Sequence, residues 1–170
     1  MRYTIAVALL TLAIGARHLP AQQPQGGLVR RSMEGPRLGA TFVTGRRADA
    51  RLREYGVNPF MSQFGWHFEQ DVSPASSGPE FVVEEVVLLG AVEQNTLVPS
   101  ATLLMGIRLP RGFEFGIGPN VSPLGSGLAL AIGQTLTYGG VRLPINLAVV
   151  RSPGALRTTL LMGYAIQRAN

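Results

Sequence analysis

Residues 128–138 read LALAIGQTLTY and alternate between two kinds of side chain with a period of two. Successive side chains of a β-strand point to opposite faces of a sheet, so this period predicts a strand. One face carries the larger side chains Leu128, Leu130, Ile132, Gln134, Leu136 and Tyr138. The other face carries the small or weakly polar side chains Ala129, Ala131, Gly133, Thr135 and Thr137. A soluble sheet with one solvated face normally carries charge on that face, and this stretch has none.

The same alternation continues, with short interruptions, from Thr96 to Gln167. Together with the segments before it, it predicts eight strands, over residues 37–44, 61–72, 80–94 (with a bulge or bend at Gly90), 98–109, 112–122, 126–138, 141–150 and 155–168. The links between most of these strands are short, and Gly139-Gly140 is a signal for a tight hairpin. Short links cannot hold a parallel crossover, so neighbouring strands should be antiparallel.

One segment between the first two strands has a helical pattern. Arg46–Tyr55 reads RRADARLREY, with Thr44 placed to cap its start and Gly56 to end it. Residues 37–170 are therefore predicted to form a single all-β domain. The expected fold is an antiparallel up-and-down β-barrel of about eight strands with one short helix after the first strand.

The N-terminus has the pattern of a secretory signal. Residues 5–14 are an apolar run of ten, which is too short to span a bilayer as a helix and suits the apolar region of a signal peptide. We predict a signal peptide over residues 1–21, with cleavage after Ala21, and a flexible leader over residues 22–36. The protein is thus expected to be exported.

The composition of the 170 residues narrows the function. Only 15% of the residues are charged, and the formal net charge is +5, part of which lies in the predicted signal peptide. No basic block with interleaved aromatic residues appears, so we expect no nucleic-acid partner. Cysteine is absent, which excludes disulfides and thiolate metal clusters. No cofactor is predicted.

The unequal faces favour strands with lipid outside and a narrow lumen inside. On this interpretation eleven side chains face lipid: Phe113, Phe115, Leu128, Leu130, Ile132, Leu143, Ile145, Leu147, Leu160, Met162 and Tyr164. A polar cluster around Glu114 is predicted in the lumen, comprising Arg108, Glu114, Arg142, Asn146 and Arg157. Each buried charge needs a partner there, because an unpaired one costs several kcal/mol. The cluster would plug the lumen, so the protein should not conduct.

The opposite arrangement is a soluble periplasmic or secreted β-barrel or sandwich whose large side chains fill a core and bind an apolar ligand. Pro144 favours it, because a proline within a strand removes a hydrogen bond of the ladder. The single tryptophan and the C-terminal residues 167–170 (QRAN) favour it too, since outer-membrane barrels commonly carry aromatic girdles and end on an aromatic residue. The two arrangements differ in which face is solvent-accessible.

Two resemblances support a barrel in the cell envelope. By its strand pattern, the chain from Arg37 to Arg168 resembles the small eight-stranded outer-membrane barrels of Gram-negative bacteria. Three segments, residues 61–66 (MSQFGW), 114–122 (EFGIGPNVS) and 144–150 (PINLAVV), resemble an uncharacterised family of exported bacterial β proteins. The second resemblance implies export and β architecture, and no activity or catalytic residue.

Candidate catalytic chemistry centres on His67, the only histidine after the predicted signal peptide. His67, Glu69 and Asp71 share one strand face, whereas Ser62 is on the other, so a serine nucleophile activated by His67 would have to come from elsewhere. A histidine at a strand end, near the lipid headgroups, is the simpler interpretation. One histidine does not make a typical histidine-based metal site, so no metal is predicted. Glu80, Glu84, Glu85 and Glu93 divide between two faces and are expected to be solvated.

These observations predict an outer-membrane β-barrel with a structural or surface-interaction role and no catalytic residues. Its expected partners are membrane lipid and an envelope protein. The alternatives are the soluble ligand-binding barrel and, third, a lipid-modifying outer-membrane enzyme.

Overall fold

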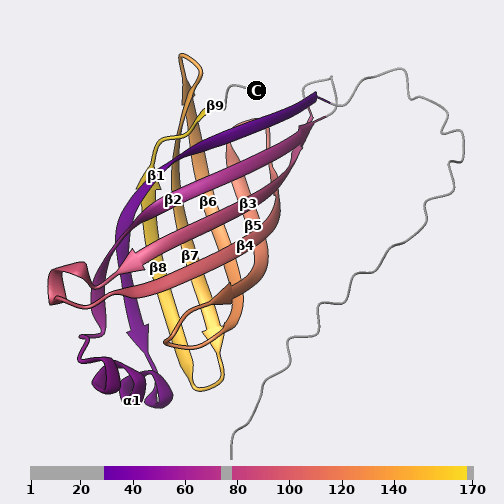
Figure 1. The fold of residues 1–170 in the computed structure, drawn as a ribbon. Helices are drawn as coiled ribbons and strands as arrows, with labels where there is room; N and C mark the ends of the chain where they lie inside the picture. The colour runs from indigo at the N-terminus through magenta and orange to yellow at the C-terminus, as the bar shows by residue number, and fades with distance from the viewer. Residues whose placement is uncertain (1–28, 74–77, 168–170) are drawn as a thin grey trace, which may run out of the picture.

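The chain folds into a closed antiparallel β-barrel, and the computed structural model describes residues 29–73 and 78–167 of it (Figure 1). Within these residues the wall has eight long strands and one very short one. They are β1 (Val29–Thr44), β2 (Phe60–Ser73), β3 (Glu80–Gly90), β4 (Val98–Arg108), β5 (Phe113–Val121), β6 (Gly127–Tyr138), β7 (Val141–Ser152), β8 (Ala155–Gly163) and β9 (Ile166–Gln167). The prediction of an all-β up-and-down barrel of about eight strands is confirmed.

The strand β1 closes the barrel, because it pairs with β2 along one edge and with β8 along the other. The strand β9 pairs with β1 in the register that β8 would have if it continued, so β8 and β9 form one interrupted strand. The path from Arg31 of β1 through the paired residue of each neighbouring strand runs once around the barrel. It returns to β1 at Thr41, ten residues further along. With ordinary strand spacings this offset tilts the strands by about 40° from the barrel axis.

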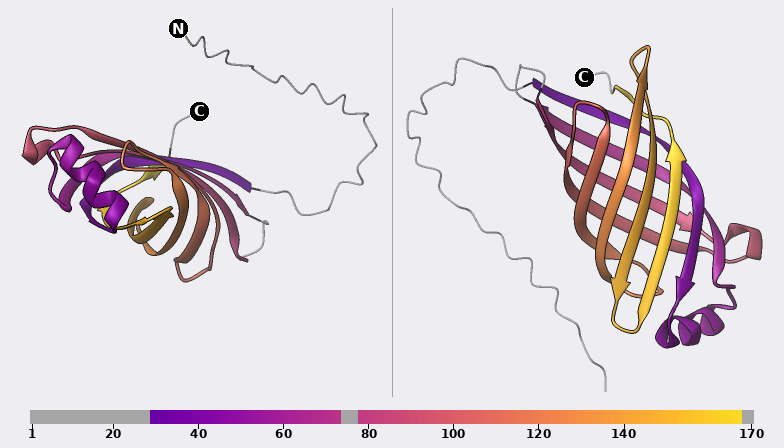
Figure 2. Two further views of the ribbon diagram at one scale, coloured as in Figure 1. Left: turned by 90° about the horizontal axis from the view of Figure 1, so that it is seen from below. Right: turned by 180° about the vertical axis from the view of Figure 1, so that it is seen from behind.

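The connections divide between two ends of the barrel (Figure 2). The termini end holds the start of β1, the end of β9 and the connections β2–β3, β4–β5 and β6–β7. The helix end holds the connections β1–β2, β3–β4, β5–β6 and β7–β8. At the termini end, Gly139 and Gly140 have φ angles of 56° and 81°, the left-handed values that a two-residue hairpin needs. The predicted Gly-Gly hairpin is therefore present.

The helix α1 (Arg46–Tyr55) follows β1 as predicted and lies at the helix end. Gly56 ends it in the left-handed conformation, with φ 65°. The expected cap by Thr44 is wrong, because the N-cap is Gly45 and no side chain caps the helix. No helix among the described residues is long and apolar enough to cross a membrane.

Two predicted boundaries are wrong. Residues 29–36, which were expected in a flexible leader, belong to β1, because β2 is long enough to pair with β1 from Val29 onward. The rest of that leader and the predicted signal peptide lie outside the described residues. The strand predicted over residues 80–94 ends at Gly90, where Ala91 turns the chain with φ 63°. A short 3₁₀ helix, η1 (Val92–Gln94), follows it.

Pro144 is accommodated at an interruption in the pairing of β7 with β8. The ladder ends at the pair Ile145–Met162 and resumes as the isolated bridge Arg142–Ala165. Pro144 lies between these two pairings, so the ladder is interrupted where the proline has no N–H to donate, and the wall stays closed on both sides of it. The proline therefore does not argue against a closed barrel.

The wall separates two unlike faces. Along β6, Leu130 is 55% exposed on the outer surface, whereas Ala129, on the inner face, is fully buried. The other strands show the same alternation, with large apolar side chains outside and small or polar ones inside. The arrangement in which the large face forms a core is wrong for this chain.

The helix end of the lumen is closed by an apolar cluster, which we call the apolar cap. It joins residues of β1, α1, β2, β4 and the connections at that end: Val43, Ala48, Leu52, Val57, Met61, Ala91, Val98 and Leu124. Ala48 and Leu52 supply the buried stripe of α1. The helix thus covers one end of the barrel.

Candidate functional site in the barrel lumen

The termini half of the lumen holds a network of buried charges, which we call the ion-pair cluster. Five strands contribute to it: Glu69 and Asp71 from β2, Glu80 from β3, Arg108 from β4, Glu114 from β5 and Arg142 from β7. Every residue of the cluster except Glu80 is less than a tenth exposed. Because charges this deep are stable only when paired and hydrogen-bonded, each arginine serves more than one carboxylate.

Arg108 is bound on two sides. Its Nη1 and Nη2 donate to the two carboxylate oxygens of Glu69 at 2.8 and 2.7 Å, the bidentate geometry of a guanidinium on a carboxylate. Its Nε donates to Glu114 at 2.8 Å. Arg108, which lies on β4, therefore links β2 to β5.

Arg142 reaches the same acids from the opposite wall. Its Nη1 donates to Glu69 Oε1 and, at 2.5 Å, to Asp71 Oδ2, while Nη2 lies 3.4 Å from Glu80 Oε2. Glu69 is thus shared by two arginines and is the centre of the network. This cross-lumen contact joins residues 73 positions apart in the chain.

Glu114 completes its contacts with neutral donors. Asn146 Nδ2 donates to Glu114 Oε1 at 2.6 Å, and Thr135 Oγ1 lies 3.3 Å from both carboxylate oxygens. Of the residues predicted to surround Glu114, Arg108 and Asn146 do so, and Arg142 belongs to the same network through Glu69. The prediction missed Glu69, Asp71 and Glu80, although the outward Phe68 and Gln70 place Glu69 and Asp71 on the inner face.

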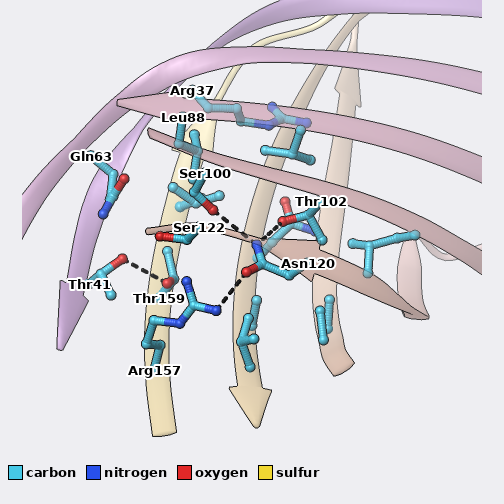
Figure 3. A pocket seen from close by; sticks show the side chains of 18 of the residues that line it. Arg37, Thr41, Gln63, Leu88, Ser100, Thr102, Asn120, Ser122, Arg157 and Thr159 are labelled. Atoms are coloured by element: carbon cyan, nitrogen blue, oxygen red, sulfur yellow. Dashed lines mark hydrogen bonds between the residues drawn. The ribbon is translucent and has the colours of Figure 1, made fainter. Parts of the chain in front are cut away.

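Arg157 does not join the cluster. It lies in the helix half of the lumen, where its Nη2 donates to Asn120 Oδ1 at 2.7 Å and to the carbonyl of Gly125 at 2.6 Å (Figure 3). Asn120 in turn donates to the hydroxyls of Ser100 and Thr102 at 2.9 and 2.7 Å. A second polar group therefore braces β4, β5 and β8 below the apolar cap.

A cavity of about 60 Å³ separates the two polar groups. Its lining mixes apolar side chains such as Leu88 and Leu104 with polar ones such as Arg37, Gln63 and Glu84 (Figure 3). That volume is room for a few water molecules. The end of the lumen beyond the ion-pair cluster is instead an open recess of about 530 Å³, lined by Glu80, Arg142 and the connections of the termini end.

His67 lies in the middle of β2 and is fully buried inside the barrel. The expectation of a strand-end histidine near the headgroups is wrong, because the side chain points inward between Glu69 and Glu84. Its Nε2 is 3.6 Å from Glu69 Oε2 and 3.4 Å from Glu84 Oε2. Neither ring nitrogen has a hydrogen-bond partner among the described residues.

Ser62 points away from His67, to the outside of β2. Its hydroxyl donates to Glu93 Oε2, and its backbone N–H donates to Glu93 Oε1 at 3.0 Å. The bonds from the Ser62 hydroxyl and from Gln94 lower the pKa of Glu93 from 4.5 to about 2. Ser62 and Glu93 therefore tie the β3–β4 connection to β2.

The acidic residues of β3 and its connection fall into two groups. Glu80 and Glu84 face the lumen, with side chains 18% and 13% exposed, so the expectation of solvated charge is wrong for them. Glu85 is exposed on the outer face, and Glu93 is exposed in the helix-end connection, as expected.

The outer surface is a belt of large apolar side chains around the whole barrel. All eleven residues predicted to face lipid are on it, with exposures between 38% for Phe113 and 55% for Leu130. The β1–β3 side adds the exposed aromatic residues Phe42, Phe60, Phe64, Trp66, Phe68 and Phe81. That lipid covers these side chains stays a prediction.

The comparisons with known proteins return a fold likeness. One similar structure is that of Ail, the attachment invasion locus protein of Yersinia pestis, in complex with the heparin analogue sucrose octasulfate. Its sequence identity to this chain is 8% and its TM-score is 0.49, and the match covers 81% of this chain and 99% of the Ail chain. A second structure of Ail is 10% identical with a TM-score of 0.32 and the same coverage. No family model and no curated protein sequence matches the chain. We therefore transfer no function to it from a relative.

Proposed function

We propose that this protein is a bacterial outer-membrane β-barrel that holds a filled lumen and acts through its surface, as a structural or contact protein of the envelope. The belt of exposed apolar side chains carries this proposal. Soluble monomers rarely expose continuous apolar patches larger than a few hundred Å². A belt that surrounds the barrel needs an apolar solvent, which in the envelope is lipid.

The dimensions of the wall support a membrane-spanning role. The strands β3 and β4 have 11 residues each. At a tilt of about 40° and a rise of about 3.4 Å per residue, such a strand covers about 28 Å along the barrel axis. The apolar core of a bilayer is about 30 Å thick, and the lipid-facing band of outer-membrane barrels is about 25 Å tall.

The contents of the lumen argue against a conducting pore. The apolar cap closes the helix end, the ion-pair cluster crosses the termini half, and the cavity between them is about 60 Å³. An ion that entered would have to displace paired arginines and carboxylates. We therefore assign the protein no transport role.

The lengths of the connections orient the barrel. The helix end carries the two longest connections, residues 45–59 and 91–97, although its turn at residues 153–154 is as short as the termini-end turn at residues 139–140. Bacterial barrels have short periplasmic turns and longer extracellular loops, so the helix end would face the exterior. Exposed arginines there, at positions 46, 47, 51, 53 and 151, would meet acidic groups of the outer surface.

A matched pair of arginine substitutions tests the membrane assignment. Leu130 is 55% exposed within the belt, and Leu97 is 61% exposed in the β3–β4 connection outside it. Arginine at mid-membrane depth costs roughly 2–4 kcal/mol on the lipid face of a barrel. Leu130→Arg should therefore block assembly into the membrane fraction, whereas Leu97→Arg should not.

Equal tolerance of both substitutions, or a mature protein that stays soluble without detergent after carbonate washing, would refute the proposal. The absence of cysteine makes orientation measurable by labelling. In intact cells, a membrane-impermeant maleimide should label Arg51→Cys in α1 and spare Thr137→Cys at the termini end. The reverse pattern would overturn the orientation.

A further inference from the structure

Three side chains with metal-ligand atoms converge at the edge of the ion-pair cluster. They are His67 and Glu69 of β2 and Glu84 of β3, and one ligand atom from each lies within 4.8 Å of the others. Glu69 and Glu84 are paired residues of adjacent strands, and His67 is two positions from Glu69, so all three project inward at neighbouring points of the wall. The backbone of two strands thus holds the group together.

The contacts of His67 and Glu84 are incomplete. His67 is fully buried, yet both ring nitrogens lack a hydrogen-bond partner among the described residues. Within the same residues, the only ion-pair contact of Glu84 is with His67 at 3.4 Å. A buried imidazole normally donates one nitrogen and offers the other, so an orphaned pair of nitrogens indicates a missing partner.

We propose that His67, Glu69 and Glu84 bind a divalent transition-metal ion of the zinc class. Zinc binds imidazole nitrogen and carboxylate oxygen at about 2.0–2.2 Å, usually with tetrahedral geometry. In a tetrahedron with such bonds, neighbouring ligand atoms are about 3.3–3.6 Å apart. His67 Nε2 lies 3.4 Å from Glu84 Oε2 and 3.6 Å from Glu69 Oε2. Water from the adjacent cavity, which Glu84 lines, would supply the fourth ligand.

The surroundings fit a cation in two ways. Arg108 Nη2 donates to Glu69 Oε2, the oxygen that faces His67, and so fixes the orientation of a ligand carboxylate. The inner wall of this half carries the carboxylates of Glu69, Asp71, Glu80, Glu84 and Glu114. The guanidinium groups beside them are those of Arg37, Arg108, Arg142 and, at the open end, Arg31, which lies 3.5 Å from Glu80. The carboxylates outnumber the guanidinium groups, and a divalent ion would offset that excess.

The proposed site differs from the sequence-based prediction of no metal, which considered histidine as the only ligand. The two carboxylates complete the donor set, and they are recognisable as ligands only once the β2–β3 register is known. All three ligand atoms lie in the lumen, so metal binding would not require insertion into a membrane.

Cobalt is the probe that tests the site, since tetrahedral Co²⁺ has strong visible absorption. The full chain is refolded in detergent micelles, stripped with a chelator and titrated with Co²⁺, and zinc is then added to displace it. We expect one equivalent of tetrahedral Co²⁺ that zinc displaces. Glu84→Gln should weaken binding at least about tenfold, and His67→Gln should abolish it.

Glu85→Gln is the matched control, because it makes the same change at the next residue of β3 on the outer face. It should bind cobalt as the unsubstituted protein does. Absence of stoichiometric binding overturns the proposal, and so does binding that Glu84→Gln leaves unchanged, which would place the metal elsewhere. If His67→Gln does not fold, as judged by heat-dependent gel mobility, the comparison of Glu84→Gln with Glu85→Gln decides.

Discussion

Removing the guanidinium of Arg108 should destabilise the barrel far more than removing an exposed guanidinium. Arg108→Met keeps an unbranched aliphatic side chain, although a shorter one, and deletes all of its donors. Glu69 would retain Arg142 as a partner, but Glu114 would keep only the neutral donors Asn146 and Thr135. The main consequence is therefore one buried carboxylate without a counter-charge.

Breaking a buried ion pair by removing one partner typically costs 3–5 kcal/mol, because the remaining charge stays desolvated. We expect Arg108→Met to lower the free energy of unfolding by about that amount. Adding Glu114→Gln removes the orphaned charge and keeps a group that can still accept from Asn146. The double variant should therefore recover roughly 1–3 kcal/mol of the loss.

The assay is urea unfolding in lipid vesicles, followed by the fluorescence of Trp66, the single tryptophan, which is 42% exposed on the outer wall. Arg151→Met, at an exposed arginine of β7, is the control and should change stability by less than about 0.5 kcal/mol. Two results would refute the reasoning: a loss below about 1 kcal/mol for Arg108→Met, or a double variant no more stable than the single one.

Three further predictions concern the cap, a connection and the wall. Leu52→Ala should cost about 2–5 kcal/mol in the same assay, because it leaves a cavity in the apolar cap. The contact of Glu93 with the Ser62 N–H should persist from neutral pH through pH 4.5 and be lost toward pH 2, because a lowered pKa in the folded state gives stability that is lost as the pH falls through that pKa. Amide exchange at Ser62 measures this, and Glu93→Gln should weaken the protection at neutral pH. Gly118→Ala should prevent folding, because its Cβ would lie 1.8 Å from a carbonyl oxygen of β4; Gly116→Ala, whose nearest contact would be a side-chain carbon at 3.3 Å, should fold, and refolding yield compares the two.

Local sequence patterns were sufficient to predict most of the strands in the barrel wall. The helix α1 has the bounds that its periodicity and the terminal Gly56 predict, and β6 begins within one residue of the predicted start. The first half of β1 was missed because residues 29–36 do not alternate. Their strand conformation comes from pairing with the long β2, which is a tertiary interaction that local propensity does not contain.

The residues of the lumen could be predicted in part. An odd or even position along a strand gives the face of the sheet on which a residue lies, but not its height along the barrel axis. Arg142 and Arg157 both point inward, yet the first lies in the ion-pair cluster and the second in the helix half. Height follows from the ten-residue offset around the barrel, which depends on every register in turn. The partnership of Glu69 with Arg142 was therefore beyond reach, although Glu69 could have been assigned to the inner face.

The direction of the two faces follows from closure together with the contents of the lumen. An eight-stranded wall with this offset has a radius of about 8 Å, so inward side chains converge on a common axis while outward ones diverge. Convergence leaves each inner position little volume, which suits Ala129, Ala131 and Gly133. Closed barrels of eight strands can also hold Leu and Ile inside, so closure alone does not choose the face. Here the paired charges of the ion-pair cluster occupy the lumen, so the large face lies outside and needs an apolar environment.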